Sequence, residues 1–179
     1  MKNLNYLRDK AYQCAVAHGW HEENLSDEHF LCLVISELME AVEADRKGSH
    51  ADIEAFNKYE NRIDFEENFG RQIKGSVEEE LADAGIRLLD LAGLRKANLS
   101  ITDELTIRDV SFTEFVYCLC AYITNPDKSH SDWLSEHISY SLSRLFSWCR
   151  YKDIDILWHI EQKMKYNELR PFMHGGKAY

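Results

Sequence analysis

Only two of the 179 residues are proline and eight are glycine, so few positions in the chain must interrupt a helix. Proline removes a backbone donor and clashes with the preceding turn, which is why it ends or kinks helices. Between these residues, apolar side chains recur at helical spacing, as Leu31, Val34 and Leu38 do. We therefore expect an all-α fold, a helical bundle formed by one domain over residues 1–179.

Local signals mark the ends of the expected helices. Ser26 is a good N-cap for the second helix, and Gly48 is a natural C-terminal stop. Before the third helix, Ser76-Val-Glu-Glu79 matches a capping box, in which the Glu79 carboxylate accepts from the Ser76 amide and stays apart from any other site. The six predicted helices cover about 3–17, 27–47, 77–91, 109–124, 132–149 and 153–169.

Residues 49–75 form a polar segment in which acidic and aromatic residues are mixed without a clear period. This pattern predicts a partly helical connection that serves as an insertion or a lid. We expect no catalytic group in it.

Charge and hydropathy exclude several classes of protein. The formal net charge of -10 disfavours a nucleic-acid partner, because a phosphate-binding surface is basic. No apolar run approaches the ~20 residues of a membrane span, so we expect no membrane partner. The five cysteines lack Cys-x-x-Cys spacing and the N-terminus lacks a signal-peptide core, which predicts a cytoplasmic protein whose thiols are small buried side chains.

Two acidic pairs have a three-residue offset and lie inside amphipathic helices: Glu37 with Glu40, and Glu80 with Asp83. Chance alone gives about five such pairs in so acidic a chain, so spacing is not enough. These four border apolar stripes, where a carboxylate is costly to desolvate unless a cation compensates it. Converging from two helices, they would form an oxygen cage suited to Mg²⁺ or Mn²⁺.

A solvated helix face would give the same pattern in the second pair. Glu80, Asp83, Arg87 and Asp90 form one polar stripe, and Arg87 could pair with Asp83 or Asp90 and neutralise it without a metal. Spacing leaves both interpretations open.

The last predicted helix ends in a segment that is locally basic on an acidic chain. Its side chains offer donors for phosphate, although cations near a helix C-terminus also favour the helix dipole without any ligand. The candidate donors are Lys163, Lys165, Asn167, Arg170 and Lys177.

Three segments, 35–46, 73–92 and 167–177, resemble the MazG-like all-α nucleoside triphosphate pyrophosphohydrolases. They contain Glu-x-x-Glu, then Glu-x-x-Asp, then Asn-x-x-Arg-Pro-x-x-His-Gly-Gly-Lys. The gap between the two acidic motifs is longer than the compact family pattern, which is consistent with an insertion at 49–75.

The resemblance implies that Glu37, Glu40, Glu80 and Asp83 are catalytic and bind Mg²⁺, and that Asp90 is an outer partner of the site. It further implies that the five basic-tail donors bind a nucleoside triphosphate. A metal-activated water would attack between the α and β phosphates and release a monophosphate and pyrophosphate. Members of this family form helical-bundle oligomers, so a homodimer or homotetramer is expected.

Two other functional classes were weighed. A di-iron carboxylate bundle is disfavoured because none of the eight histidines follows a glutamate at the required three-residue offset, and the nearest form is Asp127-x-x-His130. A non-catalytic helical-bundle protein that binds a partner or a nucleotide on the same scaffold stays an alternative. The base and sugar preference is open, because Trp20, Tyr166 and His174 either line a base pocket or simply pack.

Overall fold

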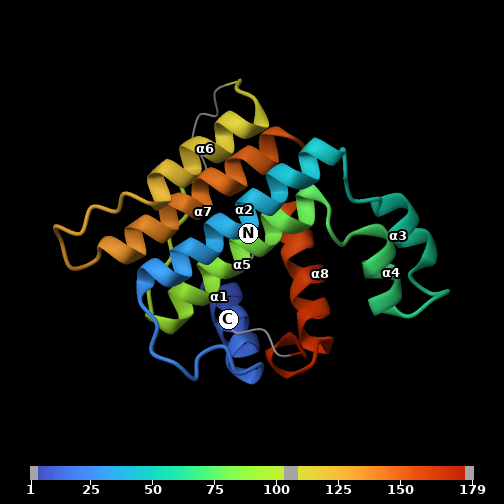
Figure 1. Cartoon of the computed structure of the whole chain (residues 1–179), viewed down its shortest axis with the longest axis horizontal. Coiled ribbons are helices and arrows are strands. Elements are labelled where there is room, and N and C mark those ends of the chain that lie inside the picture. Colours follow the sequence, from blue (N-terminus) through green and yellow to red (C-terminus); the bar gives the residue numbers. More distant parts are fainter. Residues whose placement is uncertain (1–3, 103–108, 176–179) are drawn as a thin grey trace.

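The computed structural model describes residues 4–102 and 109–175, and all regular structure within them is helical (Figure 1). A short 3₁₀ helix, Phe172–Gly175, follows the last α-helix. The α-helices are α1 (Leu4–Ala17), α2 (Asp27–Lys47), α3 (Ile53–Tyr59), α4 (Phe65–Gln72), α5 (Val77–Leu94), α6 (Phe112–Ile123), α7 (Trp133–Tyr151) and α8 (Ile156–Leu169).

The expected helix ends are largely confirmed. The Ser26 hydroxyl accepts from the His29 amide at 3.2 Å, and Gly48 stops α2 with a left-handed φ of 66°. Helix α6 begins at Phe112 rather than at about residue 109, because Ser111 and Glu114 form a capping box that fixes the start.

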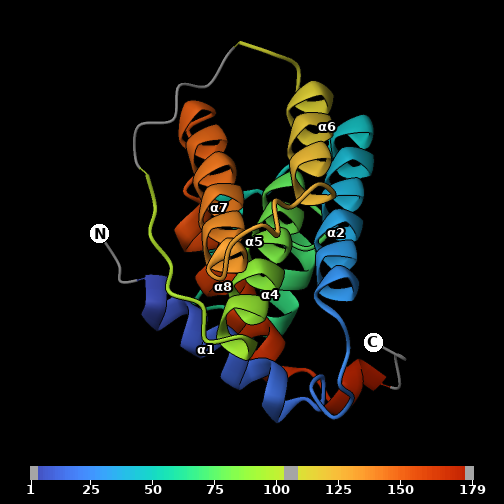
Figure 2. The same ribbon diagram turned by 90° about the vertical axis from the view of Figure 1, so that its left-hand side faces the viewer.

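Helix α5 occupies the centre of the bundle. Figure 1 shows it with α6 and α7 on one side and α1 on the other, and Figure 2 shows it between α7 and α2. It contacts α1, α2, α7 and α8. Its expected apolar stripe is confirmed, since all five members are buried: Val77, Leu81, Ala84, Leu88 and Leu91.

Residues 49–75 fold into α3 and α4, which form a separate small apolar cluster against α8. Phe56, Phe69 and Ile73 are buried there together with Tyr166 of α8. The Phe69 and Tyr166 rings stack with their centroids 4.6 Å apart. The segment is therefore packed against α8, and its role as an insertion or lid stays a prediction.

The segment after α8 is tied to the end of α1. The His18 ring nitrogen Nε2 bonds to the Arg170 carbonyl at 3.1 Å, and the Met173 amide donates to the His18 carbonyl at 3.0 Å. Gly19 has a φ of 82°, and a Cβ there would clash with the Phe172 ring. These contacts hold the segment that begins at Arg170 against the end of α1.

Two further expectations concern membrane-spanning helices and the burial of the cysteines. None of the helices in the described ranges is long and apolar enough to cross a membrane. The five cysteines are free thiols, but only Cys149 is buried. Cys32 and Cys118 are exposed, so the expectation that all five act as buried apolar side chains is wrong.

A glycine pair tests the packing of α1 on α5. A Cβ at Gly93 would clash with the Cβ of Tyr12 in α1, whereas a Cβ at Gly70 in α4 meets nothing within 4 Å. Gly93→Ala should destabilise the protein by about 1–3 kcal/mol through overpacking. Gly70→Ala should stabilise it by roughly 0.5–1 kcal/mol. Urea unfolding of both variants checks this, and an equal effect would contradict the close approach of α1 and α5.

Candidate metal and nucleotide site

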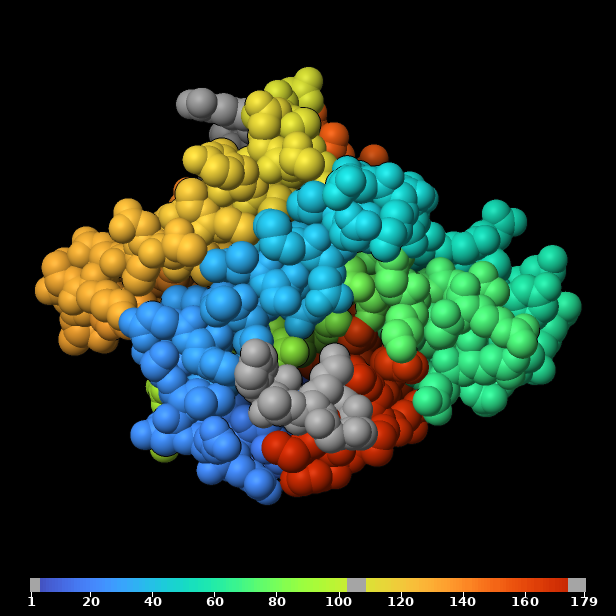
Figure 3. Space-filling view, in the orientation of Figure 1, coloured from blue at the N-terminus to red at the C-terminus, as the bar shows by residue number. Residues whose placement is uncertain are grey.

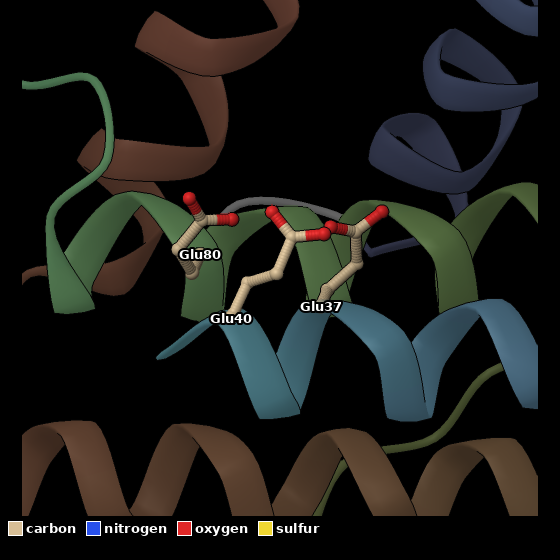
Figure 4. A group of neighbouring side chains, drawn as sticks. All are labelled: Glu37, Glu40 and Glu80. Atoms are coloured by element: carbon tan, nitrogen blue, oxygen red, sulfur yellow. The ribbon is translucent and has the colours of Figure 1, made fainter. Parts of the chain in front are cut away.

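Three of the four predicted ligands converge as the spacing suggested. Glu37 and Glu40 come from α2 and Glu80 from α5, and Figure 4 shows their carboxylates side by side in the same space. One oxygen from each lies within 4.8 Å of the others. With Mg²⁺–oxygen bonds of about 2.0–2.1 Å, opposite ligands are about 4 Å apart, so these three oxygens could share one hard cation after a small movement of their side chains.

Asp83 belongs to a second, overlapping group of carboxylates on α5. Its carboxylate, that of Glu80 and that of Glu79 lie within 4.8 Å of one another. Glu80 is common to both groups and thus connects the α2 acids to Asp83. The four predicted ligands are therefore one continuous cluster, with Glu79 as a fifth member that the sequence analysis set apart.

The interpretation of Glu79 as a capping residue needs correction. The Ser76 hydroxyl does accept from the Glu79 amide, but the Glu79 carboxylate accepts from the Gly75 amide at 2.9 Å rather than from the Ser76 amide. Only 2% of Glu79 is exposed, and its other oxygen binds Lys163. Glu79 thus faces the acidic cluster.

Lys163 enters this cluster from α8. Its ammonium binds Glu79 and lies 2.6 Å from Asp83 Oδ2, and only 6% of the residue is exposed. Burial by itself lowers the pKa of Lys163, but the charges of Asp83 and Glu79 outweigh it and raise that pKa. Lys163 is therefore a charged internal partner of the acids.

Crowding of carboxylates in a partly buried space shifts their titration. Burial first, and then the charges of Glu79 and Asp83, raise the pKa of Glu80 to about 8. Burial also raises the pKa of Asp83 to about 7, against the opposing effect of Lys163. A cation bound beside these groups would favour their charged forms, against the burial and the carboxylate repulsion that raise their pKa values.

The polar stripe of α5 is not the solvated face considered as an alternative. Arg87 donates to Glu37 of α2 at 3.0 Å, and not to Asp83 or Asp90 as that alternative allowed. Asp90 is buried, and its Oδ1 lies 2.8 Å from Nε2 of His21 in the loop after α1. Burial raises the pKa of Asp90, which the bond from His21 partly offsets.

A cavity of about 370 Å³ adjoins the cluster, a size typical of small-molecule sites. Figure 3 shows the surface hollowed between α2 and α8, with α5 visible at depth. All five acids line it, together with Lys163, Asn167 and Arg170 from the tail. Small residues of α1, namely Ala11, Cys14 and Ala15, form another part of the wall with Trp20.

The remaining sequence candidates lie elsewhere. Lys165 is exposed, and its ammonium sits 3.9 Å from the centroid of the Phe65 ring, away from the cavity wall. Tyr166 packs against Phe69 and is not a wall residue. Lys177 lies outside the described residues, as does the side chain of His174.

Lys74 was missed. It lies in the 49–75 segment, in which we expected no catalytic group, and it lines the cavity and donates to the Tyr166 hydroxyl at 3.3 Å. Its position two residues before Ser76, the N-cap of α5, was the available signal.

The pH dependence of stability tests the electrostatics of the cluster. The pKa of folded Glu80, about 8, exceeds its ordinary value of 4.5, so between these values the folded protein holds a proton that the unfolded chain has lost. Stability of the metal-free protein should therefore fall as the pH rises from about 4.5 to about 8 and then level off. Thermal unfolding in a chelator measures this. Glu80→Gln should flatten the curve, and a wild-type curve that rises with pH would contradict the assignment.

Comparisons with known proteins give no family for this chain. No model of a known protein family matches the sequence, and neither the curated proteins nor the solved structures contain a match.

Proposed function

We propose that this protein hydrolyses a nucleoside triphosphate between its α and β phosphates in a Mg²⁺-dependent reaction, giving a monophosphate and pyrophosphate. The observation that carries the proposal is the convergence of Glu37, Glu40 and Glu80 from two helices on the wall of one cavity. The choice of the bond between the α and β phosphates comes from the resemblance to the MazG-like enzymes.

Each part of the cavity has a role in this proposal. Glu37, Glu40, Glu80 and Asp83 hold the metal, and Mn²⁺ fits the same oxygen donors. Bound there, Mg²⁺ supplies an acidified water and offsets the charge of the phosphates. A carboxylate oxygen that is not bound to metal accepts the proton of the attacking water.

The rest of the cavity binds the substrate. Arg170 and Asn167 line it beside the acids, and their donors suit phosphate oxygens. Trp20 and the small α1 side chains form an apolar wall on which a flat base can pack. The expected homodimer or homotetramer stays a prediction.

A nucleotide-binding protein without turnover is a second candidate. Arg87 already pairs with Glu37 and Lys163 with Asp83, so two of the four acids are neutralised by the chain itself. A scaffold that has no need of a metal would have such pairs.

Product analysis separates these candidates. The purified protein with Mg²⁺ should convert at least one common ribo- or deoxyribonucleoside triphosphate to monophosphate and pyrophosphate, resolved by anion-exchange chromatography. Diphosphate and phosphate as products would show that the assigned bond is wrong. Binding of nucleotide by calorimetry without any turnover would favour the second candidate.

Variants of the acids test their part in turnover. Glu40→Gln and Asp83→Asn should each lower kcat by about 100-fold or more, because each removes a ligand charge while changing little volume. Glu43→Gln is the matched control, since Glu43 lies on the same helix but pairs with Arg46 and Lys47 on the surface. Circular dichroism verifies the fold, and wild-type kcat in both cluster variants would refute the metal assignment.

A further inference from the structure

The ammonium of Lys163 occupies the position of a cation within the acidic cluster. It binds Glu79 and Asp83 together, and Asp83 is one of the four carboxylates assigned to the metal. In the described part of the chain, no other side chain is found donating to Asp83. The protein therefore satisfies this carboxylate with its own charge.

The two partners of Lys163 are not equivalent. Glu79 is almost fully buried and its second oxygen is held by the Gly75 amide, so its carboxylate is fixed at the start of α5. Asp83 lies one turn further along, at 16% side-chain exposure, and shares its space with Glu80. Glu79 is thus the anchored partner, and Asp83 is the one that can exchange Lys163 for another cation.

A divalent ion and an ammonium cannot both lie against Asp83 without strong repulsion, because like charges a few ångströms apart in a partly buried space are poorly screened. The lysine stem is flexible and its ammonium acts as a point charge, so it can leave one carboxylate while it remains on another. Glu40 is exposed on α2 and needs no internal ammonium to compensate its charge.

We propose that Lys163 competes with the divalent metal for Asp83, and that Glu79 is a positioning residue which retains the Lys163 ammonium at the cavity wall when the metal displaces it. This inference rests on the metal binding of the proposed function. The displaced ammonium stays next to the metal, on the cavity wall that faces the substrate. Binding of the metal therefore also places the Lys163 ammonium toward the substrate.

Mn²⁺ affinity, measured from the electron paramagnetic resonance signal of free Mn²⁺, tests this without reference to turnover. Lys163→Met should tighten Mn²⁺ binding by about tenfold or more, because the competing charge is gone. Lys163→Arg should weaken it, because the planar guanidinium holds two carboxylates at once. Glu79→Gln should also weaken it, by about threefold or more, because Lys163 then has only Asp83 as a partner.

A double-mutant cycle separates this role of Glu79 from the simple loss of a negative charge. In the Lys163→Met background, Glu79→Gln should change Mn²⁺ affinity much less than in the wild type. An equal effect in both backgrounds would overturn the positioning role. Unchanged or weaker binding by Lys163→Met would overturn the competition, and if that variant does not fold, unchanged binding by Lys163→Arg would do so.

Asp83→Asn distinguishes failure of this inference from failure of the proposed function. If Asp83→Asn loses Mn²⁺ binding and Lys163→Met shows no gain in affinity, the assignment of Asp83 as a metal ligand stands and only the competition is refuted. Absence of Mn²⁺ binding from the wild type and every variant would refute the metal site and the inference together.

Discussion

The packing of α5 against four other helices is the constraint from which the site follows. A helix enclosed in this way has no broad solvent face, so its polar residues must share a limited space with one another. Glu79 and Asp90 are buried, and Glu80 and Asp83 are half-buried beside the cavity. The raised pKa values of Glu80, Asp83 and Asp90 are consequences of this enclosure, and so are the internal partners of these acids, Lys163 and His21.

Features that depend on near neighbours in the chain could be predicted from the sequence. The Ser26 cap, the Gly48 stop and the apolar stripe of α5 depend on residues within a few positions of one another, and all three are confirmed. The convergence of Glu37 and Glu40 with Glu80 was also predictable, because both pairs border apolar stripes that had to pack on each other.

Features that depend on distant partners could not be predicted. Glu79 fits a capping box locally, but its carboxylate binds a lysine 84 residues away, and no local pattern reports that partner. Arg87 likewise had suitable acids on its own helix, yet it pairs with Glu37, which is 50 residues away. Side chains choose partners by the geometry of the assembled helices, and that geometry is not contained in spacing along a single helix.

The stack of Tyr166 on Phe69 joins the segment between α2 and α5 to α8. Tyr166 is three positions beyond Lys163, and the Lys163 ammonium lies 5.8 Å from the centroid of its ring. Helix α4 therefore braces α8 close to the point at which α8 brings a cation to the acids. A chain without α3 and α4 would leave an aromatic ring of α8 uncovered. In the evolution of such chains, the length of the segment between α2 and α5 and the residue at position 166 should therefore change together.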